Sequence, residues 1–157
     1  MAGIARGRLA EERKSWRKNH PHGFVAKPDI KPDGSVDLLF WNCAIPGTRG
    51  TIWEGGLYPV TLQFNEDYPC KPPICKFPRG FIHPNVYASG MICLSILSES
   101  EDWQPSITVI QILLGIQNLL DKPNPASPAN HEINALFIQD VDEYKRRVIE
   151  QAKEFHP

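Results

Sequence analysis

Proline positions and apolar spacing divide the chain into regions that predict helices and regions that predict strands. Thirteen of the fifteen prolines lie within residues 28–128, whereas residues 106–122 and 129–156 contain none. Proline removes a backbone donor and clashes with the preceding helical turn, so helices are expected in the proline-free windows. The remaining middle of the chain is expected to form strands and loops.

Two helices are predicted by clear patterns. Thr108 and Gln111 form a capping-box pattern before an apolar run, which predicts a central helix over residues 109–120 that is buried on most sides. Residues 2–19 repeat apolar side chains at helical spacing and end before Pro21.

Two more helices are predicted near the C-terminus. Ser127-Pro128 has the pattern of an N-cap followed by proline at the first helical position, so a helix is expected to begin there. A last helix is expected to follow it. The apolar side chains that recur at helical spacing in these two helices are Ile133, Leu136, Phe137, Tyr144, Val148, Ala152 and Phe155.

Four strands are predicted in the proline-rich middle, over residues 24–27, 36–45, 58–64 and 74–77. The third alternates apolar and polar side chains, as a half-buried strand does. Parallel crossovers need about a dozen residues or more, and these connections are short, so we expect an antiparallel meander. The whole chain, 1–157, is expected to form a single α+β domain.

Composition excludes several classes of protein. The 157 residues are 41% hydrophobic and 22% charged with a net charge of −1, which is typical of a globular domain rather than a disordered or nucleic-acid-coating chain. The longest apolar stretch, 107–116, is far below the roughly 20 residues that cross a bilayer, so no membrane span is expected. The basic N-terminus lacks the apolar core of a secretory signal, and the four cysteines are expected to be free thiols.

Charge is distributed unevenly along the chain. Residues 1–22 carry six basic and two acidic side chains, whereas residues 23–140 carry seven basic and twelve acidic ones. Arg6, Arg13, Arg17 and His20 fall on one stripe when the helical spacing of the N-terminal region is continued to residue 20. This basic edge is either a docking surface for an acidic partner or an ordinary solvated helix face, and charge alone leaves both open.

Candidate chemistry lies in residues 81–105, because a long irregular segment inside a compact domain is usually functional. Cys93 is the candidate nucleophile, since cysteine is partly ionised near neutral pH; the alternative is a small buried hydrophobic residue. His83 is the nearest base for a Cys/His hydrolase, although isolated histidines are more often structural. The spacings of cysteine and histidine do not fit a closed zinc site and no glycine-rich phosphate loop is present, so neither a metal nor bound ATP is expected.

Several short motifs resemble the core of the ubiquitin-conjugating enzymes. The motif His83-Pro84-Asn85 precedes Cys93, which is the eighth residue after Asn85. Tyr-Pro-x-x-Pro-Pro lies upstream at 68–73, and Trp-x-Pro lies downstream at 103–105. Within this family the chain is most similar to the SUMO-conjugating branch, and its N-terminal run is similar to the plant members. The segments that carry the similarity to the SUMO-conjugating branch are 13–21, 23–24, 45–47, 53–56 and 93–97, and the run that is similar to the plant members is 6–13.

The resemblance implies the ubiquitin-conjugating fold and a carrier mechanism. This fold has an N-terminal helix, a four-stranded antiparallel meander, an active-site segment, a central helix and two C-terminal helices. SUMO would arrive from a heterodimeric activating enzyme as a thioester on Cys93 and pass to a lysine-bearing substrate as an isopeptide, with SUMO ligases as further partners. The activating enzyme would use the ATP, so no cofactor is expected here. The implied compartments are the nucleus and cytoplasm, and neither nucleic acid nor membrane is an expected partner.

The resemblance also assigns roles around the cysteine. Asn85 is either the amide that donates to the thioester oxyanion or a brace for its loop, and His83 and Pro84 are structural. Tyr87 is expected to line the groove of the acceptor lysine with Ser127, which stands where the family has an acid. A hydroxyl cannot attract an ammonium charge, so lysine activation is expected to depend more on desolvation.

Other departures concern recognition of an acidic residue beside the acceptor lysine. Lys76 and Ser89 are implied contacts, but Ile74 and Glu101 stand where the family pattern leads us to expect lysines, and Gln104 where it has arginine. We therefore expect charging to be intact and direct recognition of the acidic motif to be weakened. A Glu101→Lys, Ile74→Lys double variant is expected to restore that recognition.

Arg13, Arg17 and His20 match the patch by which this family binds a second SUMO non-covalently, and Lys14 and Arg17 are expected to contact the activating enzyme. Two other functions remain open: a ubiquitin-conjugating enzyme with a SUMO-like insertion, and a catalytically weak binding module of the same fold. Cys93 argues against the module, and the 47–55 loop, which resembles the SUMO-branch insertion, argues against the first alternative.

Overall fold

A computed structural model describes residues 2–157; Met1, the first residue of the expected domain, lies outside the described residues. The strands form one antiparallel sheet in the order β1-β2-β3-β4, which confirms the predicted α+β meander. In chain order the elements are α1 (Ala2–Lys18), β1 (Val25–Ile30), β2 (Val36–Pro46), β3 (Leu57–Gln63), β4 (Ile74–Lys76), the short 3-10 helix η1 (Ser95–Leu97), α2 (Val109–Asp121), α3 (His131–Gln139) and α4 (Val141–Glu154).

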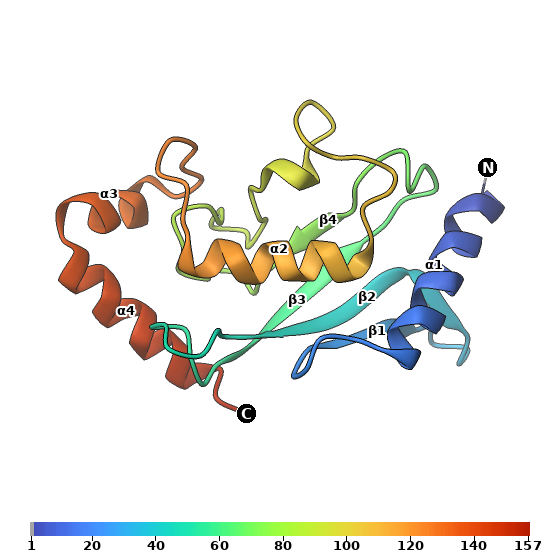
Figure 1. The fold of residues 1–157 in the computed structure, drawn as a ribbon, viewed down its shortest axis with the longest axis horizontal. Coiled ribbons are helices and arrows are strands. Elements are labelled where there is room, and N and C mark those ends of the chain that lie inside the picture. The colour runs from blue at the N-terminus through green and yellow to red at the C-terminus, as the bar shows by residue number, and fades with distance from the viewer. Residues whose placement is uncertain (1) are drawn as a thin grey trace.

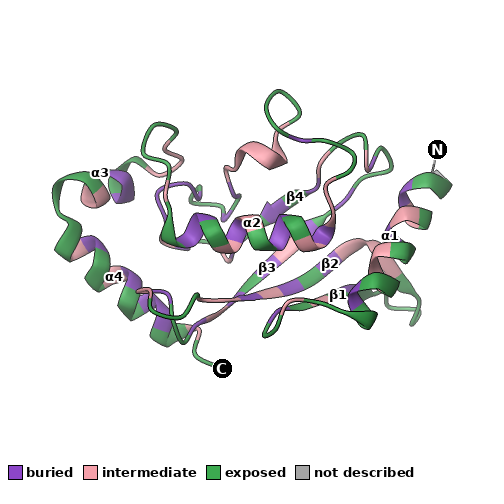
Figure 2. Cartoon of the chain, viewed as in Figure 1, coloured by how far each residue is buried: buried purple, intermediate pink, exposed green. Residues whose placement is uncertain are grey.

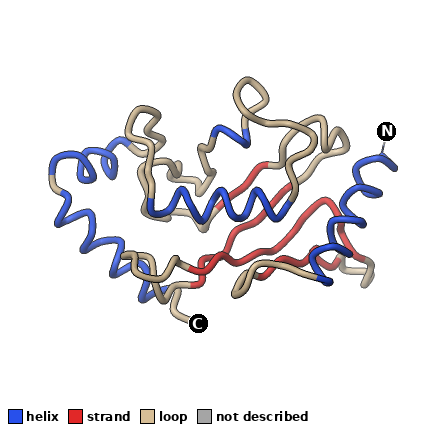
Figure 3. Tube along the Cα trace, in the orientation of Figure 1, coloured by secondary structure: helices blue, strands red, loops and turns tan. Residues whose placement is uncertain are grey.

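The central helix organises the molecule. Figure 1 shows α2 crossing the middle beside the sheet, with α1 at one end of the molecule and the pair α3 and α4 at the other. α2 contacts both β2 and η1, and α1 contacts β2. The long loop-rich segment between β4 and α2 lies along the side of α2 (Figure 3). Within the described residues, no helix combines the length and apolar character needed to span a bilayer.

α2 is fixed in place by its burial and by its first turn. The predicted capping box is confirmed: the Thr108 hydroxyl accepts from Gln111 N, and the Gln111 side chain accepts from Thr108 N. Each fully buried leucine or isoleucine contributes about 1.5–3 kcal/mol, so this helix is a rigid support for the loops around it (Figure 2). Its buried residues are Val109, Ile112, Leu113, Ile116, Leu119 and Leu120.

β1 is longer than the predicted strand 24–27, because it begins at Val25 and continues through Pro28 to Ile30. Proline within a sheet is confined to edge strands and bulges, since it cannot donate to the ladder. β1 is one of the two edge strands, and its register with β2 shifts between Pro28 and Asp29.

The helix predicted to begin at Ser127-Pro128 begins instead at His131, so that prediction is wrong. Asn130 is the N-cap, and its side chain accepts a 3.1 Å hydrogen bond from Ile133 N. The backbone N–H groups of Ala129 and Asn130 both donate to Pro84 O, at 2.9 and 3.1 Å. This long-range contact holds the chain outside the helix until Asn130.

Candidate active site

Cys93 is held by backbone hydrogen bonds to two neighbouring segments. Its N–H donates to Asn85 O at 2.9 Å, and the N–H of Ile92 donates to Cys75 O in β4 at 3.0 Å. Val86 and Ile92 form an isolated antiparallel bridge. The irregular segment is thereby attached to the edge of the sheet, which explains how a stretch without periodicity is nevertheless ordered.

His83 anchors this segment to the C-terminal end of α2. The imidazole is fully buried, and Nε2 lies 2.7 Å from Leu119 O while Nδ1 accepts from Asn85 N at 3.0 Å. A carbonyl only accepts and an amide N–H only donates, so the Nε2–H tautomer satisfies both bonds. Burial lowers the pKa of His83 to about 4, which keeps it neutral. Neither ring nitrogen is free to act as a base for Cys93, and the Cys/His hydrolase interpretation is excluded.

Asn85 joins the cysteine segment to the loop after α2. Its Nδ2 donates to Asn124 O and Ser127 O, both at 2.9 Å, and its Oδ1 accepts from Asn124 N at 2.8 Å. The side chain is buried, so these bonds are sheltered from water. Donation to a thioester oxyanion would require one of the two Nδ2 bonds to open; the choice between oxyanion donor and brace therefore stays a prediction.

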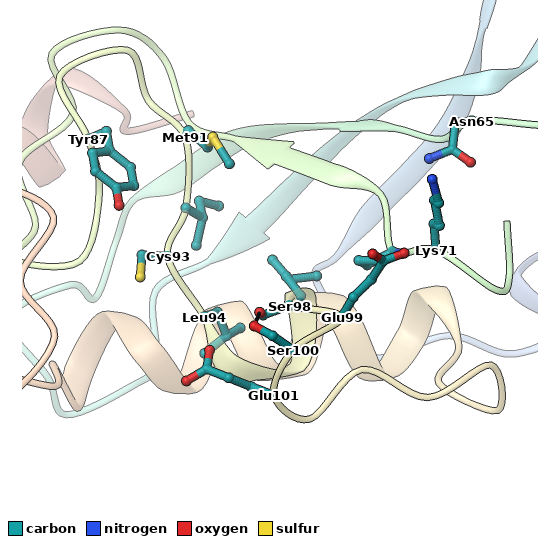
Figure 4. Close-up of a pocket in the computed structure, with 13 residues that line it drawn as sticks. Asn65, Lys71, Tyr87, Met91, Cys93, Leu94, Ser98, Glu99, Ser100 and Glu101 are labelled. Atoms are coloured by element: carbon teal, nitrogen blue, oxygen red, sulfur yellow. Dashed lines mark hydrogen bonds between the residues drawn. The ribbon is translucent and has the colours of Figure 1, made fainter. Parts of the chain in front are cut away.

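Cys93 opens onto a groove of about 540 Å³. Figure 4 shows Cys93 and Tyr87 towards one end of the groove and Lys71 and Asn65 towards the other. The Tyr87 side chain is 44% exposed. Cys93 is therefore partly exposed at the surface of this groove.

Cys93 differs from the buried cysteines in access and in pKa. It is partly exposed, whereas Cys43 and Cys75 are buried, and the described cysteines are free thiols as predicted. Burial raises the pKa of Cys43 to about 12. Partial burial, and next the charge of Glu101, raise the pKa of Cys93 as well. Cys93 is therefore accessible yet mainly protonated at neutral pH.

The other predicted acceptor-side residues lie outside the lining of this groove. Ser127 is exposed, and the Asn85 amide binds its backbone carbonyl rather than its hydroxyl. Lys76 is exposed, and its backbone forms an isolated antiparallel β-bridge with Met91. The Ser89 hydroxyl accepts a hydrogen bond from Met91 N at 3.3 Å. Ile74 is exposed on β4. Only Tyr87 and Glu101 of the acceptor-side predictions line the groove with Cys93.

A second groove, of about 390 Å³, is lined mainly by residues of α1, of β1 and of the chain between them. Arg13, Arg17 and His20 line it together. The His20 ring stacks on Trp16 with centroids 4.8 Å apart, and its Nδ1 lies 2.9 Å from Trp16 O. Lys14 is outside this lining and lies 3.8 Å from Glu11. The predicted stripe is therefore confirmed as one lining for Arg13, Arg17 and His20, whereas Arg6 lies outside it and pairs with Glu66 at 2.8 Å.

Two contributions to the site were missed in the sequence. Asn124 is the main partner of Asn85 but lies 39 residues away in the chain, and no local pattern links them. Glu101 was identified only as a departure in substrate recognition, whereas its charge also acts on Cys93. Its position eight residues after the cysteine was the available signal.

Metal chemistry has no support in the described part of the chain. Within residues 2–157, no group of three or more histidine, cysteine, aspartate or glutamate side chains is placed to hold a metal ion. His83 and Asn85 are instead hydrogen-bonded to backbone groups.

Comparison with known proteins shows the family to which the chain belongs. The family model described as "Ubiquitin-conjugating enzyme" matches residues 8–152. The chain therefore belongs to the ubiquitin-conjugating enzyme family.

Two full-length relatives refine this assignment. SUMO-conjugating enzyme SCE1 of Arabidopsis thaliana is 66% identical over 154 residues, covering 98% of this chain and 96% of the relative. Sumo-conjugating enzyme ubc9 of Dictyostelium discoideum is 55% identical over 157 residues, covering 100% of this chain and 99% of the relative. The predicted resemblance to the SUMO-conjugating branch and the predicted enzyme class, a conjugating transferase, are confirmed.

Proposed function

We propose that this chain is a SUMO-conjugating enzyme that receives SUMO as a thioester on Cys93 and passes it to a substrate lysine. The observation that carries the proposal is an accessible cysteine on an open groove whose nearest histidine is locked in a structural role. Such a cysteine suits an acyl carrier. A hydrolase needs a general base beside the sulfur to activate water, whereas a carrier passes its acyl group to an amine and does not need that base. The full-length similarity to two enzymes of this name supports SUMO as the modifier.

Two acyl transfers make up the reaction. In the first, the Cys93 sulfur attacks the thioester that joins SUMO to the activating enzyme; a new C–S bond forms, the old one breaks, and the proton that Cys93 loses is taken up by the released thiolate of the activating enzyme. In the second, a neutral lysine amine attacks the Cys93 thioester. The C–N bond forms, the C–S bond breaks, and the amine loses one proton as the Cys93 thiolate gains one. Covalent catalysis thus divides one acylation into two thioester-driven steps.

The acceptor lysine must lose its proton before it attacks. Its reference pKa of about 10.4 leaves only about one amine in a thousand neutral near pH 7.4. The apolar part of the groove and the half-exposed ring of Tyr87 disfavour the ammonium form by desolvation. Ser127 is uncharged, and because it does not cap α3 its exposed hydroxyl is free of that role. We propose that desolvation carries most of the lysine activation in this chain.

We propose further partners on the strength of the family resemblance. These are a heterodimeric activating enzyme, SUMO ligases and a second, non-covalently bound SUMO, the last at the groove formed by Arg13, Arg17 and His20. ATP is consumed by the activating enzyme, so this chain needs no cofactor of its own. The proposed compartments are the nucleus and cytoplasm, which a fluorescent fusion would test.

A charging assay tests the function. The chain is incubated with ATP and either SUMO and its activating enzyme or ubiquitin and its own, and the products are separated on non-reducing gels. We expect a reductant-sensitive SUMO adduct that Cys93→Ala abolishes. Cys70→Ala is the matched control, since Cys70 is an exposed thiol outside the groove. Charging with ubiquitin alone would instead favour a ubiquitin-conjugating enzyme, and an absence of both adducts would favour a binding module.

A further inference from the structure

The rim of the Cys93 groove carries uncompensated negative charge. Glu99 and Glu101 line the groove, and Asp102 follows them in the same loop. Among the ion pairs of residues 2–157, none involves these three carboxylates. Lys71 is the one cation in the described lining, and its Nζ lies 3.6 Å from an Asp67 carboxylate oxygen. A peptide in the groove therefore meets a rim that is negative overall.

The two glutamates of the rim point in different directions. Figure 4 shows the Glu99 carboxylate extending towards Lys71, whereas the Glu101 carboxylate lies on the side of Cys93. The influence of Glu101 on the pKa of the Cys93 thiol agrees with this placement. Glu101 is thus the carboxylate that faces the reacting end of the groove.

A hydrogen-bonded loop presents Glu101. Its own N–H donates to Ser98 O, and the Asp102 N–H donates to Ser95 O, both at 3.1 Å. The buried indole of Trp103 donates to Pro69 O at 2.9 Å and fixes the end of the loop. Because the loop backbone is already ordered, it loses little conformational entropy when a substrate segment docks. The charge interaction with Glu101 then contributes more fully to the choice between substrates.

Among the described residues that line the groove, Lys71 is the only cation, and it lies towards the end away from Cys93 (Figure 4). Ile74 is an exposed apolar residue on β4, and Lys76 is not part of the groove lining. An acidic side chain beside the acceptor lysine would meet Glu101 and be repelled. A basic side chain at the same place would be attracted by it.

We infer that Glu101 selects acceptor lysines that have a second basic side chain nearby, in place of the acidic neighbour that the family resemblance implies. This inference rests on the proposed function, because it concerns the acceptor of the same Cys93 thioester. The sequence predicts only that recognition of an acidic neighbour is weakened. The inference goes further, because it expects a basic neighbour to be preferred over an acidic one.

The experiment measures discharge from the charged enzyme. Wild-type protein carrying SUMO on Cys93 is mixed with peptides that contain one lysine and that differ only in having arginine, glutamine or glutamate at positions adjacent to it. Arginine supplies the charge without a second acceptor amine. Because exposed charge pairs are individually weak, we expect discharge to the arginine peptide to be about fivefold faster than to the glutamate peptide, with glutamine between them. High salt should reduce the difference.

Three charge reversals locate the effect. Glu101→Lys should reverse the order of the peptides, and Glu99→Lys should change it less because that carboxylate faces Lys71. Glu154→Lys makes the same charge change on an exposed residue of α4 and should keep the wild-type order. Equal rates for all peptides, a wild-type preference for glutamate, or an unchanged order in Glu101→Lys would overturn the inference. Failure of the proposed function appears earlier and differently, as the absence of any thioester on Cys93.

Discussion

Cys93 reacts from a pKa that the fold has raised. Burial and then the charge of Glu101 lift it above its ordinary value of 9.0, so the thiolate fraction grows through the neutral and mildly alkaline range. The rate of Cys93 alkylation by iodoacetamide is therefore expected to keep rising with pH at least up to pH 9.0. Glu101→Gln removes one of the two causes and should move the profile to lower pH. The rate is measured in a Cys70→Ser background, which removes the other exposed thiol.

Glu154→Gln is the matched control for this profile, since it removes an exposed carboxylate from α4 and should leave the alkylation rates unchanged. The prediction fails if wild-type alkylation levels off well below pH 9.0, or if the Glu101→Gln profile coincides with it. The first result would mean that the pKa of Cys93 is not raised, and the second that Glu101 has no electrostatic effect on the sulfur.

Asn85 is expected to stabilise the free enzyme. Its side chain makes three hydrogen bonds to the 124–127 loop and is buried. Typical hydrogen bonds contribute about 1 kcal/mol each, and partners left unpaired add to the cost, so Asn85→Ala should lower the free energy of unfolding by about 3 kcal/mol. Urea denaturation measures the change. Ser127→Ala should have little effect, because Asn85 binds the Ser127 carbonyl and not its side chain. Unchanged stability with slow lysine discharge would instead assign Asn85 to the oxyanion.

The N-terminal helix and the central helix are coupled through one carboxylate. Glu12 of α1 accepts a 2.6 Å hydrogen bond from Val109 N, which has no partner inside α2, and another from the Tyr68 hydroxyl. Arg8 Nε lies 3.2 Å from the same carboxylate, whose side chain is only 10% exposed. Hydrogen bonds to charged groups contribute about 1.5–3 kcal/mol, so Glu12→Ala should lower the free energy of unfolding by about 2–3 kcal/mol.

Thermal or urea unfolding measures this coupling. Glu11→Ala is the control, because Glu11 is exposed and its 3.8 Å pair with Lys14 is also exposed, so its removal should cost under about 0.5 kcal/mol. Glu12→Gln keeps an acceptor for Val109 N and should retain part of the stability. Equal effects of Glu11→Ala and Glu12→Ala would show that α1 does not support α2.

The predictability of these helices and strands depends on how far apart the deciding contacts lie in the chain. Thr108 and Gln111 are three residues apart, and the start of α2 was predicted correctly. The start of α3 was not, because Pro84 O holds Ala129 and Asn130 from more than forty residues away. Cys93 could be named as the candidate nucleophile from its irregular segment and its motif, which are local, whereas the Asn85 link to Asn124 depends on tertiary packing.

The whole molecule separates its charges onto two surfaces. Arg13, Arg17 and His20 line the groove formed by α1 and β1, and Glu99 and Glu101 line the groove of Cys93; the two grooves share no lining residue. The excess of basic residues in 1–22 and of acidic residues in 23–140 thus has a spatial counterpart. If the proposed function holds, changes in the basic groove should affect charging of Cys93, and changes in the acidic rim should affect discharge to the acceptor lysine.

Charge reversal on α1 tests that separation. Electrostatic complementarity mainly accelerates encounter, so Lys14→Glu, Arg17→Glu should slow charging by the proposed activating enzyme about tenfold at low salt and less at high salt. Discharge from enzyme already charged should change much less. Lys145→Glu, Lys153→Glu makes the same net charge change on exposed residues of α4. If both pairs slow charging equally, net charge rather than the α1 surface governs the encounter; if only the α1 pair does, the position of the charge decides it.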